Sequence, residues 1–504
     1  MATIIRTAEL SEDFSGMPAY YTYNGLDCCL THEIHQKLQP LHTPESRLIY
    51  DFEFAMQAPA LDMMLRGMLV DGFAKQHALT TLGSELSRLQ HIFSRLTTAM
   101  MGAPVNPASP TQLVDFFFTS PRGCRVPEFR VRTGKVWKVS ANREALEKIQ
   151  AYHHAKIFAK LCLAIRGIEK QLNTFKTGID HDGRMRCSYN VAGTETGRWS
   201  SSTNAFGMGT NMQNQTPSVR NVFIADAGMK LAYIDLAQAE SRNVGLLVFL
   251  LFNDSTYLDA CESGDLHTTV CRMVWPKLAW SSDPKANKKV ASALFYRDFT
   301  YRDMAKRGGH GTNYYGKPTT MAKHLHVDTP IMEAFQANYF KAFPGIPRWH
   351  GATATQLQTT ATLTTPVGRK RIFFSRQSDD STLREAIAYS PQSLCGDLLN
   401  LGAWRVWKHC QYLGVQLLAQ IHDAIIVQYP EHSEDRLLPL IKAQLEVPCI
   451  FNGRPFKLPC DIAVGWNWKK FSPSNPDGIK DWNNHDDRIR KDSPALSFLD
   501  RVIR

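Results

Sequence analysis

The stretch LLAQIHDAIIV, residues 417–427, is an alternating, hairpin-like apolar run with an acidic residue at its centre. A second apolar run, LAYID at residues 231–235, also ends on an aspartate. A strand that is apolar and then ends on a carboxylate can present that carboxylate in a crevice, where it can meet a metal ion. Either aspartate alone is more often a simple turn residue, so only the pair, Asp235 and Asp423, indicates a site. Metal-assisted transfer on a polyphosphate needs such a pair, because carboxylates hold the divalent ions that activate a hydroxyl and neutralise the leaving phosphate.

Between the two aspartates, the segment YRDMAKRGGHGTNYYG at residues 301–316 predicts a helix with a basic face. Arg302, Lys306 and His310 recur every four residues and fall on one side of a helix, and Tyr314 continues that row. A solvated basic face would explain the first two residues. It does not explain the glycines of the RGGHG segment, which each weaken a helix by about 1 kcal/mol and indicate close approach or bending. A mobile helix that closes over a triphosphate needs both properties.

The bulk composition limits the classes of function. At roughly 100–200 residues per domain, a chain of 504 residues predicts about three to four structural units. Hydrophobic residues make up 43% and charged residues 21%, which is ordinary for a globular enzyme. A net charge of +11 and a pI of about 9.0 favour a polyanionic partner such as nucleic acid, against the alternative of a basic enzyme without one.

The cysteines and the apolar runs argue against a secreted or membrane protein. The 11 cysteines include no CxxC pair, so we expect reduced, mostly buried thiols. The first 14 residues resemble neither a secretory signal nor a transit peptide. The longest apolar run, Leu246–Phe252, is too short to span a bilayer. We therefore expect no membrane partner and a cytoplasmic location.

Periodicity gives a coarse map of the elements. Helical patterns cover residues 84–100 and 143–172, and Pro, Asn and Ser in residues 104–118 end one helix and cap the next. The basic loop from Arg122 to Lys138 is either a solvated connector or a DNA contact. Strand patterns cover residues 229–237, 362–374, 416–430 and 457–466. The polar segment after about Phe471 predicts a tail that lies at the surface or is disordered.

Three ordered motifs resemble those of family A DNA polymerases, the class of bacterial DNA polymerase I and related phage replicases. Asp235–Arg242 matches the motif A pattern D-x-S-Q-x-E-x-R, with Ala237 in place of the serine. The helix at residues 301–316 matches motif B, R-x-x-A-K followed by an aromatic residue and G-x-x-Y, except that His310 replaces the usual Phe or Tyr and NYYG replaces a shorter ending. His422 and Asp423 match motif C, H-D-E, with Ala424 in place of the glutamate.

The resemblance implies an α+β fold shaped like a right hand, with a thumb of long helices, an antiparallel palm sheet, and fingers that carry the motif B helix. The expected regions are an exonuclease-like remnant or partner-docking segment at 1–45, a thumb and its connection at 46–190, palm at 191–260 and 351–470, fingers at 261–350, and a polar tail at 471–504. The implied function is template-directed DNA synthesis from dNTPs on a primer 3′ end by two-metal-ion transfer.

The resemblance also implies residue roles. Asp235 and Asp423, with the backbone carbonyl of Leu236, would hold two Mg²⁺ ions, or Mn²⁺ in their place. Arg302 and Lys306 would grip the β- and γ-phosphates, and Lys306 would steady charge as pyrophosphate leaves. The remaining side chains would lie around the substrates: Tyr314 near the nascent pair, His310 near the sugar, His422 beside the primer terminus, and Glu240 where it blocks a ribose 2′-hydroxyl.

Two further segments resemble primer-template contacts of the family. TGRWSSSTNAFGMGTNMQN at 196–214 supplies Arg198, Asn211, Gln213 and Asn214. The spacing R-x7-Q-x4-D of the segment that lines the duplex is kept by Arg384, Gln392 and Asp397, with Ala388 where the family usually has Asn.

The N-terminus departs from the family pattern. Tyr23 and Asp27 resemble the last motif, Y-x3-D, of the 3′–5′ exonuclease domain, but only 22 residues precede Tyr23. A helix N-terminus without a catalytic part explains them as well. We expect that the chain lacks self-contained proofreading, or that a separately encoded 3′–5′ exonuclease subunit completes the site.

The sequence alone leaves two other functions open. A single-subunit RNA polymerase shares the chemistry, but Glu240 and the lack of a large promoter-reading N-terminal region disfavour it. A non-catalytic DNA-binding scaffold fits the basic charge and the Ala237 and Ala424 replacements, but not the retention of both carboxylates and both phosphate-binding cations.

Overall fold

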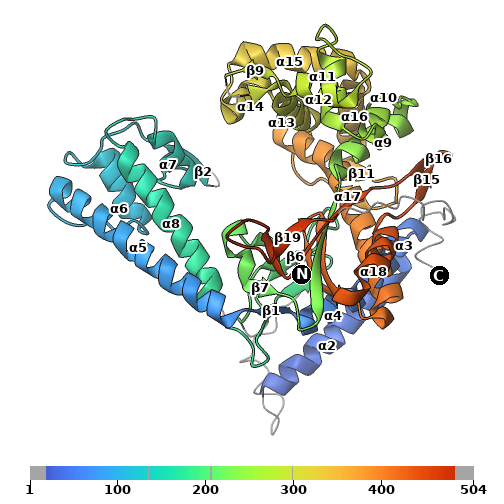
Figure 1. Ribbon diagram of the computed structural model, residues 1–504, viewed down its shortest axis with the longest axis horizontal. Helices are drawn as coiled ribbons and strands as arrows, with labels where there is room; N and C mark the ends of the chain where they lie inside the picture. The colour runs from blue at the N-terminus through green and yellow to red at the C-terminus, as the bar shows by residue number, and fades with distance from the viewer. Residues whose placement is uncertain (1–18, 134–135, 177, 205–206, 298, 483–504) are drawn as a thin grey trace.

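A computed structural model describes residues 19–133, 136–176, 178–204, 207–297 and 299–482. The predictions for residues 1–18 and 483–504 lie outside these described residues. Three large clusters of buried hydrophobic side chains divide the rest into a sheet body, a helical lobe and a helical arm (Figure 1). The arm and the lobe rise from the sheet body on either side of an open space. These are the positions expected for the thumb and the fingers, respectively.

The sheet body is built round a nine-stranded sheet. All strand pairings in it are antiparallel except that of β18 with β19. In spatial order the strands are β13 (Gln416–Ile421), β14 (Ala424–Pro430), β8 (Met229–Leu236), β17 (Cys460–Gly465), β19 (Gly478–Asp481), β18 (Asn467–Lys470), β7 (Phe223–Ile224), β1 (Met68–Val70) and β4 (Arg184–Met185).

Helices cover the β13–β14 end of this sheet. The long helix α17 (Asp380–Cys410) and the shorter α4 (Gln57–Arg66) contact β13, and α18 (Glu434–Leu445) contacts β14. The other elements of the sheet body are α2 (Ala19–Leu38), η1 (Gln39–Leu41), α3 (Pro44–Ala55), η3 (Met212–Asn214), η4 (Pro217–Val222), η5 (Gln411–Leu413), η6 (Glu431–Ser433), and the hairpins β5 (Ser188–Asn190) with β6 (Ser200–Ser202) and β15 (Cys449–Phe451) with β16 (Arg454–Phe456).

The helical arm is a pair of long helices with a small cap at its far end. Asp71 begins α5 (Gly72–Met101) by accepting hydrogen bonds from two backbone amides, and Gly102 ends it with a left-handed φ of 81°. The helix α8 (Lys156–Lys176) packs along α5. The cap consists of α6 (Pro110–Val114), η2 (Asp115–Thr119), the hairpin β2 (Arg130–Thr133) with β3 (Val136–Val139), and α7 (Arg143–Ile149).

The helical lobe carries the predicted basic helix. That helix, α13 (Tyr301–Asn313), begins with a capping box between Thr300 and Asp303. The other elements of the lobe are α9 (Ala239–Phe252), α10 (Thr256–Glu262), α11 (Leu266–Val274), α12 (Pro284–Ala291), β9 (Leu294–Tyr296), β10 (Phe299–Thr300), α14 (Pro318–Leu325), α15 (Thr329–Ala342) and α16 (Gly345–Thr360). The hairpin β11 (Thr362–Thr364) with β12 (Lys370–Ile372) leads back from the lobe to α17.

Close packing explains the glycines of α13, as the sequence predicted. A Cβ atom on Gly308 would stand 2.8 Å from Cε1 of Phe335, and one on Gly309 would stand 3.2 Å from Cε2 of Tyr339. Both aromatic residues belong to α15, so the two helices approach with no room for side chains between them.

Several elements differ from the sequence predictions. The helical pattern at 143–172 is two helices, because the chain turns between Ile149 and Lys156. The basic loop from Arg122 to Lys138 contains the β2–β3 hairpin. The segment after Phe471 is not wholly a surface tail, because Gly478–Asp481 forms β19 inside the main sheet, between β17 and β18. The predicted strands are confirmed, and so is the prediction that most cysteines are buried: nine of the eleven are buried, and none of them is paired in a disulfide.

Candidate active site

A cavity of about 640 Å³ lies where the sheet body meets the helical lobe. Seven of the residues that line it were predicted as site residues: Asp235, Leu236, Glu240, Arg302, Lys306, His310 and Asp423. They come from β8, the start of α9, α13 and the β13–β14 turn. The lining residues are Asp235, Leu236, Gln238, Ala239, Glu240, Ser241, His267, Arg302, Lys306, Arg307, His310 and Asp423.

Strand register sets the two aspartates side by side. His422 and Asp423 form a two-residue turn between β13 and β14, and His422 takes a left-handed φ of 54°. The first residue of β14, Ala424, pairs directly with Asp235 on β8. The backbone amide of Leu236 also donates a hydrogen bond to the carbonyl oxygen of Asp423, at 3.1 Å. Motif A and motif C are therefore held together through the backbone.

A third carboxylate flanks Asp235 on its other side. Asp461 of β17 pairs directly with Asp235, so the two side chains lie on the same face of the sheet. The pKa of Asp235 is raised to about 6, first by partial burial and then by the charges of Asp423 and Asp461, while Lys470 opposes the shift. The site therefore carries an excess of negative charge that a cation would relieve.

Arg198 and Glu240 form the centre of a charged network beside the aspartates. Nη2 of Arg198 lies 2.8 Å from Oδ1 of Asp423 and donates a hydrogen bond of 2.9 Å to Oε1 of Glu240. The hydroxyl of Tyr314, just after the end of α13, donates to the other oxygen of Glu240 at 2.7 Å. Burial and the Glu240 charge raise the pKa of Tyr314 well above its ordinary value, so this hydroxyl remains a donor. Glu240 is thus fixed at both of its oxygens.

The opposite wall of the cavity is basic. Arg302, Lys306 and His310 project from one row of α13, and Nη2 of Arg302 contacts Oδ1 of Asp265 at 3.1 Å. His267 of α11 also lines the cavity, and its pKa is lowered to about 4 by burial and by the charges of Arg302 and Lys306. At neutral pH this imidazole is uncharged, and it offers a hydrogen bond rather than a charge.

The carboxylates fit a divalent ion that a substrate helps to hold. Within the described residues, no group of three or more His, Cys, Asp or Glu side chains is placed to bind a metal ion by itself. Mg²⁺ is usually bound by only one or two carboxylates together with substrate phosphates. Asp235 and Asp423 supply two hard oxygen donors, and the raised pKa of Asp235 reflects neighbouring negative charge that a cation would relieve, so the pair agrees with that mode.

The predicted primer-template residues lie in different surroundings. The side chain of Asn211 caps η3 by accepting from the backbone amide of Asn214, which is itself exposed. Gln213 is buried, and its amide donates to the carbonyl of Trp199 at 3.0 Å and to Oε1 of Gln420 at 2.7 Å. These three residues lie on one turn next to the β13 strand.

Two residues of the predicted duplex-lining segment are accessible on α17, and the third is not. Arg384 is exposed and Gln392 is half-buried. Asp397 is fully buried and accepts three hydrogen bonds, of 2.7, 3.0 and 3.1 Å, from Arg369. The expectation that Asp397 lines the duplex is therefore wrong for this structure, since its carboxylate has a structural partner inside the protein.

Three residues of the site were not predicted from the sequence. His267 and Arg307 line the cavity but lie outside the residues that carried the motif matches, and Asp461 is placed by strand pairing alone. The only signal for Asp461 was its position in the predicted strand at 457–466. Pairing partners cannot be read from a single strand pattern, so no argument from the sequence could have set it beside Asp235.

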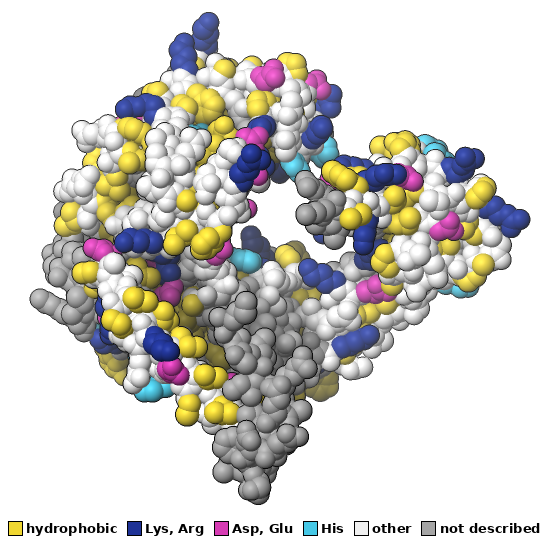
Figure 2. Space-filling view, turned by 180° about the vertical axis from the view of Figure 1, so that it is seen from behind, with side chains coloured by type: hydrophobic (Ala, Val, Ile, Leu, Met, Phe, Trp, Pro, Cys, Tyr) yellow, Lys and Arg dark blue, Asp and Glu magenta, His cyan; other side chains and the backbone are white. Residues whose placement is uncertain are grey.

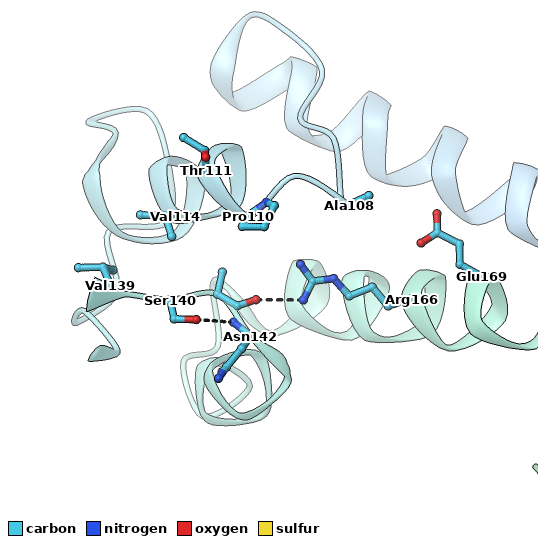
Figure 3. A pocket seen from close by; sticks show the side chains of 10 residues that line it. Ala108, Pro110, Thr111, Val114, Val139, Ser140, Asn142, Arg166 and Glu169 are labelled. Carbon is cyan, nitrogen blue, oxygen red and sulfur yellow. Dashed lines mark hydrogen bonds between the residues drawn. The ribbon is translucent and has the colours of Figure 1, made fainter. Parts of the chain in front are cut away.

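A second cavity, of about 620 Å³, lies in the cap of the arm and has a structural role (Figure 3). Arg166 crosses its floor and donates to the carbonyl oxygens of Ala141 at 3.0 Å and Pro107 at 3.2 Å. Glu169 accepts from Gln90 of the neighbouring helix. These groups tie the cap to the long helices, and the cavity brings no carboxylates together.

The space between the arm and the lobe is open to solvent. Figure 2 shows it as a gap through the molecule, with Lys and Arg side chains around its rim. Separately, none of the helices in the described part of the chain is long and apolar enough to cross a membrane.

Most of the chain is similar to proteins of one family. A family model described as DNA polymerase family A matches residues 76–470. The thermostable DNA polymerase I of Thermus filiformis is 26% identical over 457 residues, covering 86% of this chain and 50% of that protein. The DNA polymerase I of Chloroflexus aurantiacus is 24% identical over 478 residues, covering 90% and 46%. The chain thus spans about half the length of these relatives.

Among solved structures, the POL domain of Pol1 from M. smegmatis, in complex with DNA primer-template and dNTP, has a similar fold. The TM-score is 0.64 at 21% sequence identity, and the match covers 82% of this chain and 69% of that one.

Proposed function

The chain belongs to DNA polymerase family A, and from this premise we propose that it extends the 3′ end of a DNA primer with dNTPs in the order set by a template strand. One observation supports this most strongly. A single cavity holds both motif aspartates, the basic row of α13 and Glu240. A scaffold that only bound DNA would not need two carboxylates brought together by strand pairing in a cavity that is also lined by cations of a separate helix.

We infer that Asp235 and Asp423, with the carbonyl of Leu236, hold two divalent ions. Mg²⁺, or Mn²⁺ in its place, would lower the pKa of the attacking 3′-hydroxyl and would compensate the negative charge of the leaving pyrophosphate. The protein's own contribution is to fix the two carboxylates through the Leu236–Asp423 hydrogen bond, so that little reorganisation is needed during the reaction.

The basic wall is proposed to bind the triphosphate. Arg302 offers a guanidinium fork and Lys306 a compact charge, and both face the carboxylates across the cavity. Lys306 stays close to the leaving group, where its charge or its proton stabilises the departing pyrophosphate. His267 adds a neutral hydrogen-bonding group on the same side.

Glu240 is proposed to select the sugar. Tyr314 and Arg198 hold its carboxylate from two sides, so it cannot swing aside to admit a ribose 2′-hydroxyl without losing both hydrogen bonds. This rigidity favours dNTPs and argues against the RNA polymerase alternative. His310, whose ring centroid lies 4.9 Å from that of Tyr314, completes the wall near the sugar.

The primer-template is proposed to lie in the gap between arm and lobe. A net charge of +11 favours a polyanion there, and contacts made mainly to phosphates would give binding that weakens steeply with salt and depends little on sequence. Arg198, Asn211, Gln213 and Asn214 on one side, His422 at the centre, and Arg384 and Gln392 on α17 are the proposed contact residues.

A proofreading partner is proposed for the N-terminal helix. The described part of α2 has one buried side chain, that of Thr22, and it exposes several apolar residues, including Tyr20 at 72% and Ile34 at 56%. A separately encoded 3′–5′ exonuclease subunit bound there would complete the Tyr23–Asp27 motif. Strong 3′–5′ primer degradation by the purified chain alone would count against a partner supplied in trans.

Primer extension tests the proposed function directly. The purified chain should extend a labelled primer on a template with dNTPs and Mg²⁺, and only weakly with rNTPs. Asp235→Asn and Asp423→Asn should abolish extension, whereas Asp481→Asn, which changes an exposed carboxylate of the same sheet, should not. Absence of metal-dependent extension by the unaltered chain would reject the proposal.

A further inference from the structure

Arg307 is a cation of the cavity for which the motifs give no role. It follows Lys306 on α13 and lines the same cavity as Asp235 and Asp423. The side chain is exposed, and its guanidinium carbon lies 5.4 Å from the ring centroid of Phe299.

The surroundings leave the guanidinium of Arg307 available. Among the described residues, its side chain makes no ion pair and no hydrogen bond. It stacks on Phe299, and its charge helps to lower the pKa of Asp303, one turn earlier on α13. The other two arginines of the region are engaged, since Arg302 contacts Asp265 and Arg198 contacts Asp423 and Glu240. A stacked guanidinium keeps its planar set of N–H donors free, and that geometry suits bidentate binding of phosphate oxygens.

We propose that Arg307 is a third cation for the incoming nucleotide, which binds the terminal phosphates of the triphosphate beside Arg302 and Lys306 and retains the pyrophosphate product until release. This inference rests on the proposed function and extends it to a residue outside the motif pattern. Phe299 acts as a platform that holds the guanidinium toward the cavity, so less side-chain freedom is lost when the phosphates bind.

The test compares Arg307→Ala with a matched control. Arg348 on α16 is also an exposed arginine stacked over a phenylalanine, at 4.2 Å from the ring of Phe252, but it does not line the cavity. Arg307→Ala should raise the KM for dNTP by about tenfold or more, because a charge-assisted pair of hydrogen bonds is lost, with kcat changed much less. The KM for pyrophosphate in the reverse reaction should rise in parallel. The KM of Arg307→Lys for dNTP should lie between the values of the unaltered enzyme and of Arg307→Ala, since lysine keeps the charge but lacks the planar guanidinium.

Primer-template affinity, measured by fluorescence anisotropy, separates nucleotide binding from DNA binding. Arg307→Ala should leave this Kd within about twofold, and Arg348→Ala should leave all three constants within about twofold. An unchanged KM for dNTP in Arg307→Ala would overturn the inference. A weaker primer-template Kd with unchanged KM for dNTP would also overturn it, and would assign Arg307 to the template strand. If the unaltered chain incorporates no dNTP, the proposed function fails and this inference fails with it, whereas equal KM values in an active enzyme reject this inference alone.

Discussion

Lowering the pH from 7 to 5 should neutralise Asp235 and weaken the binding of a divalent ion to the free protein. Partial burial raises the pKa of this carboxyl to about 6, and the neighbouring Asp423 and Asp461 add to the shift. A carboxyl with that pKa is about 90% ionised at pH 7 and about 10% ionised at pH 5, whereas an ordinary aspartate remains more than about 90% ionised at both. Because a proton and a metal ion compete for the same oxygens, the affinity should fall about tenfold over this interval.

Electron paramagnetic resonance of free Mn²⁺ measures this affinity without DNA, nucleotide or catalysis. Asp235→Asn should bind Mn²⁺ weakly at both pH values. Asp461→Asn should move the fall in affinity to lower pH, because one of the like charges that raise the pKa of Asp235 is gone. Equal Mn²⁺ affinity at pH 7 and pH 5, with loss only near pH 4, would contradict this prediction, since it would mean that Asp235 titrates as an ordinary aspartate.

Three further changes test the fold and the site. Asp397→Ala should lower the free energy of unfolding by about 2–3 kcal/mol in a denaturant titration, because buried Arg369 loses three hydrogen bonds and keeps only Glu53 as an ion-pair partner. A loss below about 1 kcal/mol would contradict this. Gly308→Ala should lower the free energy of unfolding by about 1–3 kcal/mol, since the added Cβ would stand 2.8 Å from Phe335. As a control, Gly351→Ala places a Cβ on helix α16 with no atom within 4 Å, so it should be neutral or stabilising by up to about 1 kcal/mol in the same titration. Equal effects of the two substitutions would contradict close packing at Gly308. Glu240→Ala should raise the ratio of rNTP to dNTP incorporation by roughly a hundredfold in single-nucleotide assays, and an unchanged ratio would remove Glu240 from sugar selection.

The chemistry of the site was predictable from the sequence because it depends on residue types at fixed local spacing. The row Arg302, Lys306 and His310 follows from helix geometry, and the turn at His422 and Asp423 follows from an apolar run interrupted at its centre. Both patterns are local, and the structure places both at one cavity.

What the sequence could not predict depends on pairing between distant segments. Asp461 lies beside Asp235 only because β17 pairs with β8 in one register, and a shift of one residue would turn it to the other face. Likewise, Asp397 has the spacing of a DNA-lining residue, but Arg369 from the β11–β12 hairpin region binds it inside the protein. The break between α7 and α8 lies in a stretch of continued helical pattern, where tertiary packing outweighs propensity.

A double-variant cycle on Asp235 and Asp423, measured as the rate of single-dNTP incorporation at saturating substrate, tests whether the two aspartates form one shared site. If Asp235 and Asp423 act as one unit, each single Asn variant should lose about a thousandfold or more, and the double variant should lose no more than the worse single one. A single variant that keeps nearly the full rate, or two losses that multiply in the double variant, would contradict a shared site.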